Sequence, residues 1–420
     1  MTRRRLRVAL VMPYYDPRVD GDPAVRLARF PTVPELAAEL ARLGFDVRAF
    51  HLSDRNAEAR WSGVEHRFVA TGWVRRAAAR LLWRLSPRFT APYYEPAFGL
   101  VRRVLLSRPD IVHVFGLNMD VNVWLLARAA AYRGIPLVAH FHGGVPAVDS
   151  LTRFLQRGSL RRMSRVLFTH AAQAQPWLTA GLRPDQVGVV IETSTCIPRL
   201  PRPRRADRTL SGNPACVLVG RLHPVKDPLT ALTAFALLAE AVPSARLHVF
   251  SGSDAFGRRF PALVRSVPVL AGRVVFYDYT KPRDLAAVLA DADLLLQASR
   301  REWSSLSVLE ALATGVVPVV TDIPALRALT NDGRVGRLVP VGDARAMADA
   351  AIALAGNRAE LERLSLAGRA DFDARLSFRA LAREVARTYG DVVADSASSV
   401  DVPSGRRTRR PSASTSPPAA

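Results

Sequence analysis

The strongest constraint on the fold of this chain is an alternation of short apolar runs with helix-forming segments, which occurs twice along the sequence. In the first half the strand-like runs are residues 6–11, 46–50, 110–114 and 136–140. A second series begins at Cys216, with the runs CVLVG, RLHVFSG, VVFYDY, LLLQAS and VVPVVT. Because repeated β-α-β units form parallel sheets with helices on both faces, the pattern predicts an α/β protein with two Rossmann-like domains. Such sheets bind ligands beyond the carboxyl ends of their strands, so we expect a cleft shared by the two domains.

Shifts in composition give the expected domain boundaries. Residues 198–213 are rich in proline and arginine, as is typical of a linker, and the C-terminal segment combines low hydrophobicity with serine, proline and arginine, as is typical of disorder. The predicted parts are a first domain at 1–200, a linker at 201–213, a second domain at 214–372, a C-terminal helix at 373–394 and a disordered tail at 395–420.

Cysteine content, hydropathy and charge exclude several classes of protein. The two cysteines, Cys196 and Cys216, cannot form a disulfide framework or a cysteine-rich metal site. No apolar run approaches the ~18 residues of a membrane-spanning helix, and the N-terminus fits a first strand better than a signal peptide, so we expect a cytoplasmic protein. The net charge of +22 predicts attraction to polyanions, that is, nucleic acid, anionic lipid or phosphorylated substrates.

The first candidate site lies in the segment REWSSLSVLEALATGVVPVVTD. Glu302 follows an apolar strand-like run, and Glu310 lies on the next expected helix, which Ser304 or Ser305 would cap. The amides from Ser304 to Leu306 then lie at a helix N-terminus, which favours an anionic or hydroxylated ligand. The two carboxylates can accept hydrogen bonds from two polyols of one ligand, although two solvated glutamates would show the same spacing.

The second candidate site lies in the segment VGRLHPVKDPLTAL. Arg221 and Lys226 occupy the loop between a strand that ends at Gly220 and the following helix. Two cations in such a loop suit a diphosphate, because charge-assisted hydrogen bonds contribute about 1.5–3 kcal/mol each. Alone this signal is weak, since arginine is frequent throughout the chain.

Together, in this order, the two segments resemble the GT-B glycosyltransferases of the large retaining group with an E-x7-E signature, the group 1 glycosyl transferases of family 4. The resemblance covers residues 215–345, and SFRALAREVARTYGDV resembles the C-terminal helix that crosses back to the first domain in that family. The segments MPYYDP, RPDIVHVFG and LVAHFHGG match more loosely. The resemblance implies a first domain for the acceptor, a second domain for a nucleotide-diphosphate sugar, and transfer to an acceptor hydroxyl with retention.

The resemblance also implies roles for individual residues. Cations at the positions of Arg221 and Lys226 hold the donor diphosphate in that family. The glutamate at the position of Glu310 binds ribose hydroxyls, and the one at the position of Glu302 contacts the donor sugar. The backbone at Ser305 and Leu306 completes the donor-binding set of the second domain.

The sequence departs from the family pattern at two places. Trp303 follows the first glutamate, where the family has glycine. In the first domain, Gly21 lies between two aspartates where the family often has a Gly-Gly pair near the donor phosphates. We keep Gly21 as a donor-binding candidate, and the neighbouring aspartates can serve the acceptor instead.

Histidines in the first domain supply a second catalytic candidate beside Glu302. His113, His140 and His142 are expected to cluster, and the family often has a histidine at this strand end near the reacting sugar. His142 precedes two glycines and is the residue we choose. A histidine buried in the core or a loop is the alternative.

We expect no metal ion and no other cofactor. An H-x-H pair suggests a metal ligand set, but no nearby carboxylate or cysteine completes it. The segment Asp291-Ala292-Asp293 resembles the metal-binding D-x-D of another glycosyltransferase fold, yet it fits the end of a helix better. Arg221 and Lys226 already supply the positive charge that a leaving diphosphate needs.

Residues 73–86, WVRRAAARLLWRLS, are predicted to form an amphipathic helix. Its arginines recur every four residues and form a basic stripe with two tryptophans beside it, which suits a membrane interface. The alternative is a surface helix that packs on its own domain. The hypothesis adds peripheral contact with an anionic membrane, on its cytoplasmic face.

We interpret the chain as a glycosyltransferase whose partners are a nucleotide-sugar donor and a sugar, lipid-linked or small-molecule acceptor. One alternative is a catalytically silent GT-B module that binds nucleotide or anionic surfaces. An arginine-rich nucleic-acid binder is a third class, but no recognised binding motif supports it, and we expect no nucleic-acid partner. Release of nucleoside diphosphate from a donor distinguishes the enzyme from both alternatives.

Overall fold

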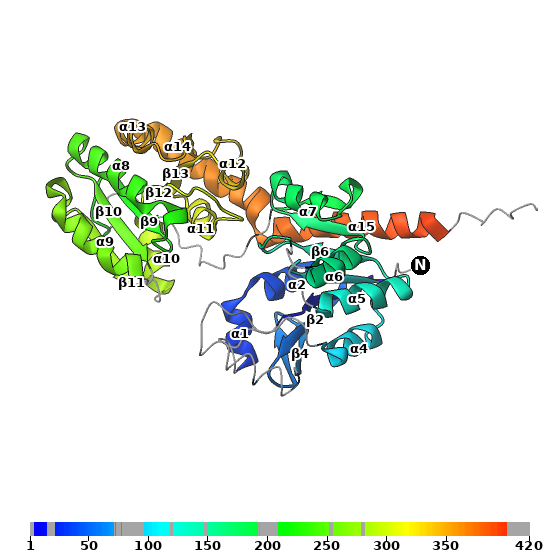
Figure 1. Ribbon diagram of the computed structural model, residues 1–420. Helices are drawn as coiled ribbons and strands as arrows, with labels where there is room; N and C mark the ends of the chain where they lie inside the picture. The colour runs from blue at the N-terminus through cyan, green and yellow to red at the C-terminus, as the bar shows by residue number, and fades with distance from the viewer. Residues whose placement is uncertain are drawn as a thin grey trace, which may run out of the picture.

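The computed structural model describes residues 4–14, 22–70, 96–117, 121–146, 150–191, 209–251, 255–278 and 282–400, together with the single residues 72, 77 and 193. Within these residues the chain forms two α/β domains, each built on a sheet with helices on both faces (Figure 1). The architecture therefore confirms the predicted fold class. Gly21 and the predicted helix at 73–86, apart from Ala77, lie outside the described residues, as does most of the predicted linker.

The first domain contains an eight-stranded sheet in the order β3-β4-β2-β1-β5-β6-β7-β8. Its strands are β1 (Arg7–Met12), β2 (Asp46–Ser53), β3 (Ala57–Trp61), β4 (Val64–Ala70), β5 (Ile111–Phe115), β6 (Leu137–His140), β7 (Arg165–Phe168) and β8 (Val187–Val189). Neighbouring strands are parallel except β3 and β4, which form an antiparallel hairpin at one edge. The hairpin turn, Ser62-Gly63, has positive φ at both residues, as a type I′ turn requires.

Helices cover both faces of this sheet. They are α1 (Pro23–Arg29), α2 (Thr32–Arg42), α4 (Phe98–Leu106), α5 (Val121–Tyr132), α6 (Ser150–Leu160) and α7 (Gln175–Thr179). One apolar core lies between the sheet and α4 to α7, around Val114 and Trp177. The other core lies on the opposite face, where α2 packs beside the C-terminal helix.

The second domain contains a parallel sheet in the order β11-β10-β9-β12-β13-β14. Its strands are β9 (Ala215–Val219), β10 (Arg246–Ser251), β11 (Val274–Asp278), β12 (Leu294–Gln297), β13 (Val317–Thr321) and β14 (Arg337–Val339). Its helices are α8 (Pro228–Ala241), α9 (Ala255–Ser266), α10 (Pro282–Asp291), α11 (Leu306–Thr314), α12 (Pro324–Leu329), α13 (Ala344–Gly356) and α14 (Arg358–Asp371). Two apolar cores again lie on the two faces of the sheet.

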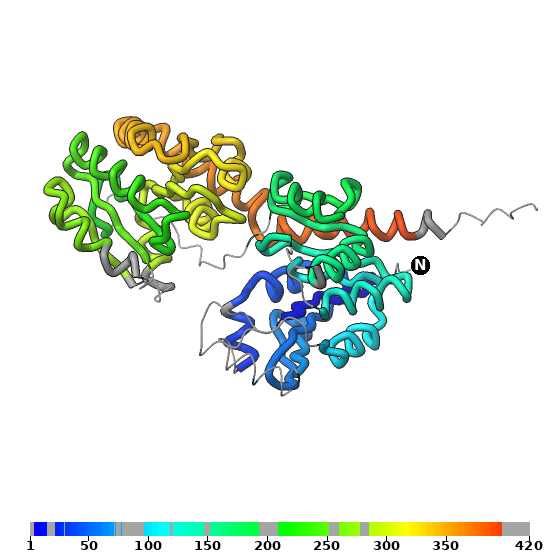
Figure 2. Tube along the Cα trace, in the orientation of Figure 1, coloured from blue at the N-terminus to red at the C-terminus, as the bar shows by residue number. Residues whose placement is uncertain are grey.

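The C-terminal helix α15 (Phe378–Val400) leaves the second domain and packs on the first, as Figure 2 shows in orange and red. Its apolar face, which includes Leu381, Val385 and Tyr389, joins the core that α2 covers. This confirms the predicted crossover helix. The predicted end of that helix at residue 394 is wrong, because the helical backbone continues to Val400. The predicted disorder therefore does not begin at residue 395, and residues 401–420 lie outside the described part of the chain.

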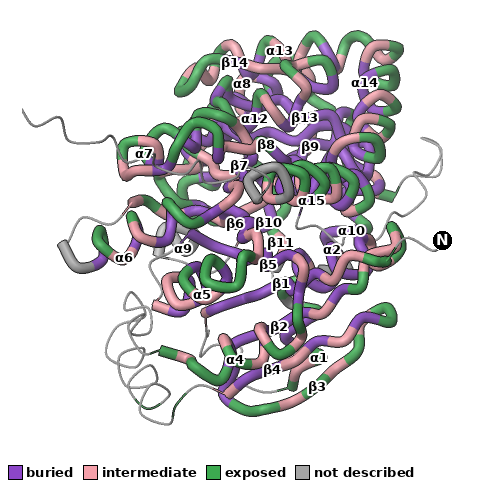
Figure 3. The backbone as a smooth tube through the Cα atoms, turned by 90° about the vertical axis from the view of Figure 1, so that its right-hand side faces the viewer, coloured by how far each residue is buried: buried purple, intermediate pink, exposed green. Residues whose placement is uncertain are grey.

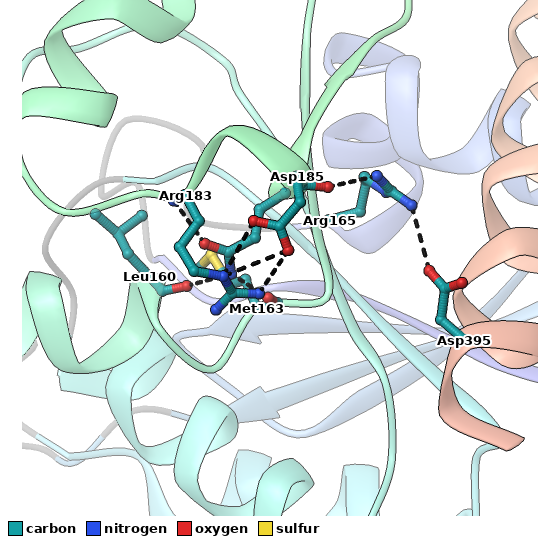
Figure 4. Close-up of polar contacts among 7 residues, drawn as sticks. Leu160, Met163, Arg165, Arg183, Asp185 and Asp395 are labelled. Carbon is teal, nitrogen blue, oxygen red and sulfur yellow. Dashed lines mark hydrogen bonds and ion pairs between the residues drawn. The ribbon is translucent and has the colours of Figure 1, made fainter. Parts of the chain in front are cut away.

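One ion pair joins the last turns of α15 to the first domain (Figure 4). The Arg165 guanidinium donates to the backbone carbonyl of Asp185 (2.6 Å) and lies 3.5 Å from the Asp395 carboxylate of α15. Because Asp395 is largely exposed, this ion pair is worth only ~0–1 kcal/mol. The apolar contacts of α15, and not this pair, therefore fix the helix.

The burial pattern follows the layers (Figure 3). Strands are mostly buried, and the helices expose their outward sides. Among the described residues, no helix has both the length and the apolar character that crossing a bilayer requires.

Candidate active site

The candidate site lies at the loops that follow β9 and β12, which are neighbours in the second sheet. The amide of Arg300 donates to the carbonyl of Val225 (2.9 Å), and the Arg300 guanidinium lies 2.7 Å from the Asp227 carboxylate. These contacts join the two loops. The two segments, which are about 80 positions apart in the sequence, therefore lie side by side and make up one candidate site.

Glu302 is buried and forms an ion pair with Lys226. Its side chain is 6% exposed, and its Oε1 accepts hydrogen bonds from Lys226 Nζ (2.5 Å), Ser299 Oγ (2.7 Å) and Gln297 Nε2 (2.9 Å). A buried carboxylate needs such partners, because an unpaired buried charge is costly. The Lys226 side chain is 27% exposed, and its ammonium has further N–H donors that an anion can use.

Arg221 is the second cation of the loop after β9. Gly220 has a φ of +134°, a conformation that favours glycine, and it turns the chain out of the strand. Arg221 is exposed, and among the described residues its guanidinium has no hydrogen bond or ion pair. The loop therefore presents one free guanidinium and one partly exposed ammonium.

Ser305 occupies the N-cap of α11, but its side chain does not cap the helix. Its Oγ donates instead to Gln297 Oε1 (2.9 Å), as does Ser307 Oγ (2.7 Å). The predicted N-cap position at Ser305 is confirmed, but no serine side chain caps the helix, because the Ser305 hydroxyl is bonded to Gln297 instead. The first helical hydrogen bond is from the Leu309 amide to the Ser305 carbonyl (3.1 Å), so the N–H groups of Leu306, Ser307 and Val308 precede it and can donate to a ligand.

A buried hydroxyl adds to this polar surface. Ser304 Oγ is buried and has no hydrogen-bond partner among the described residues. Leaving such a group unpaired costs about 1–3 kcal/mol, so it is well suited to pair with a bound ligand. It lies two residues from Glu302 and directly before the N-cap of α11.

Glu310 lies in the second turn of α11 and is buried. Its residue exposure is 8%, and among the described residues its carboxylate has no hydrogen-bonding partner. Desolvation raises its pKa to about 7. A carboxylate in this state can accept hydrogen bonds from ligand hydroxyls, which would replace the water that it has lost.

The three histidines of the first domain cluster as predicted, but they differ in position. His113 and His140 are buried on β5 and β6, with ring centroids 5.6 Å apart, whereas His142 lies just beyond β6 with its ring 5.5 Å from that of His140. His113 Nδ1 lies 2.7 Å from the hydroxyl of Tyr389 in α15. His113 and His140 are thus core residues, and His142 is the one at the strand end.

The acidic pair near β12 is structural. Asp291 is the last residue of α10, and its carboxylate accepts hydrogen bonds from the amides of Thr209 (3.0 Å) and Leu210 (3.1 Å). Asp293 accepts from the amide of Ala215 (3.0 Å). The interpretation of this segment as a helix end is confirmed. Among the described residues, no group of three or more histidine, cysteine, aspartate or glutamate side chains is arranged to hold a metal ion.

Two glutamines that the sequence analysis missed position the loop after β12. Gln297 connects the carboxylate of Glu302 to the serines of α11. Gln173, in the first domain, donates through Nε2 to the backbone carbonyl of Trp303 (2.5 Å). A polar residue at the end of the apolar run LLLQ was the available signal for Gln297. No local signal marks Gln173, because its partner lies 130 positions away in the sequence.

Comparison with protein families matches both domains. Residues 30–191 match the model described as "Glycosyl transferase 4-like domain", and residues 213–357 match the model described as "Glycosyl transferases group 1".

Similar curated proteins include three bacterial enzymes. The putative glycosyltransferase EpsD of Bacillus subtilis (strain 168) is 32% identical over 334 residues, which cover 73% of this chain and 84% of that protein. The phosphatidyl-myo-inositol mannosyltransferase of Mycobacterium leprae (strain TN) is 29% identical, with coverage of 74% and 81%. The D-inositol 3-phosphate glycosyltransferase of Corynebacterium aurimucosum is 28% identical, with coverage of 87% and 90%.

Similar solved structures share the two-domain architecture at low sequence identity. Sucrose-phosphate synthase from Thermosynechococcus elongatus aligns with a TM-score of 0.63 and 18% identity, over 93% of this chain and all of that chain (100%). Anabaena HepE in complex with UDP and glucose aligns with a TM-score of 0.61 and 16% identity, over 92% of this chain and 100% of that chain.

Proposed function

The chain belongs to the glycosyl transferases group 1 family and has the GT-B fold, and on this premise we propose the reaction that it catalyses. The enzyme takes a nucleotide-diphosphate sugar and transfers the sugar to an acceptor hydroxyl with retention of the anomeric configuration. The observation that carries the proposal is the ion pair of partly exposed Lys226 with buried Glu302, in the loops after β9 and β12 that also hold Arg221 and lead into α11.

The donor diphosphate binds between the loop after β9 and the start of α11. Arg221 and Lys226 supply two positive charges, and the amides of Ser305 and Leu306 lie at the positive end of the helix dipole, which attracts anions. In the first domain, Gly21 is the candidate for a further contact. Glu310 accepts hydrogen bonds from the ribose hydroxyls of the nucleotide.

The transferred sugar lies between Glu302 and His142. Glu302 is engaged by three hydrogen-bond donors, which stabilise its charge and make it a poor nucleophile. We therefore favour a front-face displacement. The bond from the anomeric carbon to the phosphate oxygen breaks, the acceptor oxygen bonds to that carbon on the same face, and the acceptor proton passes to the leaving diphosphate. The protein contributes positioning and electrostatic stabilisation.

The reaction needs no metal ion in this proposal, because Arg221, Lys226 and the N-terminus of α11 together supply positive charge to the leaving diphosphate. Activity should survive treatment with EDTA, measured as release of nucleoside diphosphate from the cognate donor. Complete loss that magnesium or manganese restores would contradict this.

A basic surface of the first domain supports the proposal that the acceptor is lipid-linked and lies at a membrane. We name this surface the arginine face. It consists of Arg102, Arg103, Arg108, Arg128, Arg133, Arg153, Arg157, Arg161 and Arg162. Residues 96–108, 121–134 and 150–164 contain no acidic residue, although Glu95, Asp120 and Asp149, outside the described residues, precede them. The phosphatidyl-myo-inositol mannosyltransferase relative, which its name links to a lipid acceptor, agrees with this proposal.

Exposed apolar side chains lie on the same three helices, α4, α5 and α6, which pack side by side on one face of the sheet (Figure 1). The exposed fractions are 65% for Phe98, 64% for Leu106, 89% for Tyr132 and 70% for Phe154. Arginine mixed with exposed aromatic and aliphatic side chains is typical of surfaces that bind the headgroup region of a bilayer. We propose that this face rests on the cytoplasmic surface of an anionic membrane.

A donor screen tests the proposed reaction. Purified protein is incubated with single nucleotide sugars, release of nucleoside diphosphate is measured, and the anomeric configuration of the product is determined by NMR. Glu302→Gln should slow transfer without weakening the binding of the bare nucleotide, because it removes a negative charge from beside Lys226. Binding without release for every donor and acceptor class would instead support the catalytically silent module.

A further inference from the structure

The indole of Trp303 reaches out of the second domain and packs on the core of the first. Its ring centroid lies 5.5 Å from that of Phe141, at an interplanar angle of 82°, which is the edge-to-face geometry that aromatic pairs prefer. The residue belongs to the partly buried set around the core beneath α4 to α7. The guanidinium of Arg301 lies 5.7 Å from the ring centroid. Trp303 is thus a contact between the domains.

Gly143 accommodates this indole because it has no side chain. A Cβ atom at Gly143 would lie 3.2 Å from Cδ1 of Trp303, which is closer than ordinary van der Waals contact. The φ of +101° also favours glycine. The tryptophan where the family has glycine therefore meets a glycine of the other domain.

The backbone of Trp303 is held from the same side. Gln173 Nε2 donates to its carbonyl (2.5 Å), and Gln173 Oε1 accepts from the amide of Thr169 (2.8 Å). Gln173 is 4% exposed. Both the oxygen and the nitrogen of this buried side-chain amide are hydrogen-bonded, so its orientation is fixed. The position of the loop after β12 relative to the first domain is therefore fixed as well.

We infer that Trp303 is a positioning residue, which sets His142 of the first domain relative to Glu302 of the second. Glu302 directly precedes Trp303, and His142 directly precedes Gly143, so one ring contact fixes the backbone beside both groups. The inference rests on the proposed roles of His142 and Glu302 at the reacting sugar.

This arrangement predicts a separation of catalysis from nucleotide binding. A displacement of ~1 Å between reacting groups can cost about 100-fold in rate. Trp303→Ala should therefore lower kcat by about 10- to 100-fold, while the Kd for bare nucleoside diphosphate stays unchanged because Arg221, Lys226 and Glu310 are intact. Trp303→Phe keeps an aromatic ring against Phe141 and should retain activity within about threefold.

The test compares both variants with Trp61→Phe and Trp61→Ala, which alter a half-buried indole on the edge hairpin of the first domain. Steady-state kinetics give kcat and KM, and calorimetry gives the nucleotide Kd. The difference in acrylamide quenching of tryptophan fluorescence between the wild type and Trp303→Phe reports whether the Trp303 indole is shielded from solvent. A shielded indole, a loss of kcat in Trp303→Ala alone and an unchanged Kd would support the inference.

Three results would overturn it: unchanged kcat in folded Trp303→Ala, a parallel loss of kcat and nucleotide affinity, or an indole that is freely quenched. Absence of transfer by the wild type with every donor would refute the proposed function itself, and the role of Trp303 with it. That result differs from an active wild type with an equally active variant, so the two failures are distinguishable.

Discussion

At the scale of single residues, the burial of Glu310 makes nucleotide binding sensitive to pH. Its pKa is raised to about 7 by desolvation, so the carboxylate loses its charge as the pH falls through neutrality. Hydrogen bonds to a charged acceptor contribute about 1.5–3 kcal/mol and those to a neutral one about 0.5–1.5 kcal/mol. We expect the affinity for bare nucleoside diphosphate to fall by roughly 5-fold, about 1 kcal/mol, between pH 8 and pH 6.

Glu310→Gln provides the control, because it keeps the hydrogen-bonding shape without the titrating charge. The phosphate groups of the ligand titrate identically with both proteins, so the difference between the two profiles isolates residue 310. Calorimetry should show weaker binding by the variant at pH 8 and a flatter pH profile. Parallel profiles would contradict the assignment of Glu310 to the ribose.

Replacement of Lys226 should affect both the binding of the diphosphate and the environment of Glu302. Lys226→Ala removes a positive charge from the diphosphate and also removes one of three donors from buried Glu302. A lost charge-stabilising donor costs about 2–4 kcal/mol of transition-state stabilisation, and we expect kcat/KM to fall accordingly.

Lys226→Arg should recover part of this loss, because it keeps the charge. Arg345→Ala is the matched control, since Arg345 lies on α13 and is paired with the exposed Asp349 instead of the site. If folded Lys226→Ala has an unchanged kcat/KM, the diphosphate does not bind at this loop.

At the scale of elements, one contact between α15 and the first sheet makes stability depend on pH. His113 of β5 faces Tyr389 of α15, and burial, with nearby His142 as a second cause, lowers its pKa to about 3. An unfolded histidine titrates near pH 6.5, so unfolding takes up a proton below that value. The stability that neutral His113 contributes is complete above pH 6.5 and is lost as the pH falls toward 3, by about 1.4 kcal/mol per pH unit.

His113→Gln keeps a hydrogen-bonding group toward Tyr389 but does not titrate. Its free energy of unfolding should be lower than that of the wild type at pH 7.5 and should fall less steeply between pH 6.5 and pH 4.5. Urea unfolding at three pH values measures this, with the exposed His223→Gln as the control. Equal slopes in wild type and His113→Gln would be inconsistent with a buried neutral His113.

The elements that the sequence revealed are those with continuous apolar runs. β1, β5 and β6 are buried along their length and were predicted, as were β9 to β13 of the second domain. β3 was missed because its residues alternate between half-buried and exposed at a sheet edge, and β8 and β14 (Arg337–Val339) were missed because they are only three residues long. β7 was missed although it is as long as β6, which was predicted. Burial by neighbouring elements, which no local pattern reports, decides such strands.

In the candidate site too, the sequence indicates local features and not contacts between distant segments. Arg221, Lys226, Glu302 and Glu310 are local to two loops and one helix, and the sequence placed them there. The contacts of Trp303 with Gly143 and Gln173 join residues that are more than 100 positions apart, so no spacing rule could indicate them. The ion pair between Lys226 and Glu302 likewise depends on the adjacency of β9 and β12 in the sheet.

At the scale of the whole molecule, arginines differ in whether a carboxylate is paired with them. Arg42 and Arg67 of the first domain and Arg337 of the second are paired with glutamates. Among the described residues, no arginine of the arginine face has an ion pair, and Arg128 instead lies over the ring of Trp124, 4.9 Å from its centroid. Within the part of the chain that the structure describes, the arginine face therefore carries positive charge that no carboxylate neutralises.

This asymmetry predicts that the arginine face binds anionic lipid. Basic residues near an anionic surface contribute about 1 kcal/mol each, so replacement of three should weaken binding by about 3 kcal/mol, or roughly 100-fold. Salt should act in the same direction, because the Debye length falls from ~10 Å at 0.1 M to ~3 Å at 1 M. Neutral vesicles should not bind, since the exposed aromatic side chains alone cover little area.

The experiment is co-sedimentation of the full chain with vesicles of phosphatidylcholine alone or with phosphatidylglycerol. Three triple variants carry the same loss of charge: Arg153/Arg157/Arg161→Ser on α6, Arg76/Arg80/Arg84→Ser in the sequence-predicted helix, and Arg345/Arg363/Arg387→Ser as the control. If only the first variant loses vesicle binding, the arginine face is the docking surface. If only the second variant loses it, residues 73–86 bind the membrane. If the control variant loses as much vesicle binding as the other two variants, the attraction comes from net charge alone. Binding to nucleic acid without binding to vesicles would instead identify a polyanion of another class as the partner.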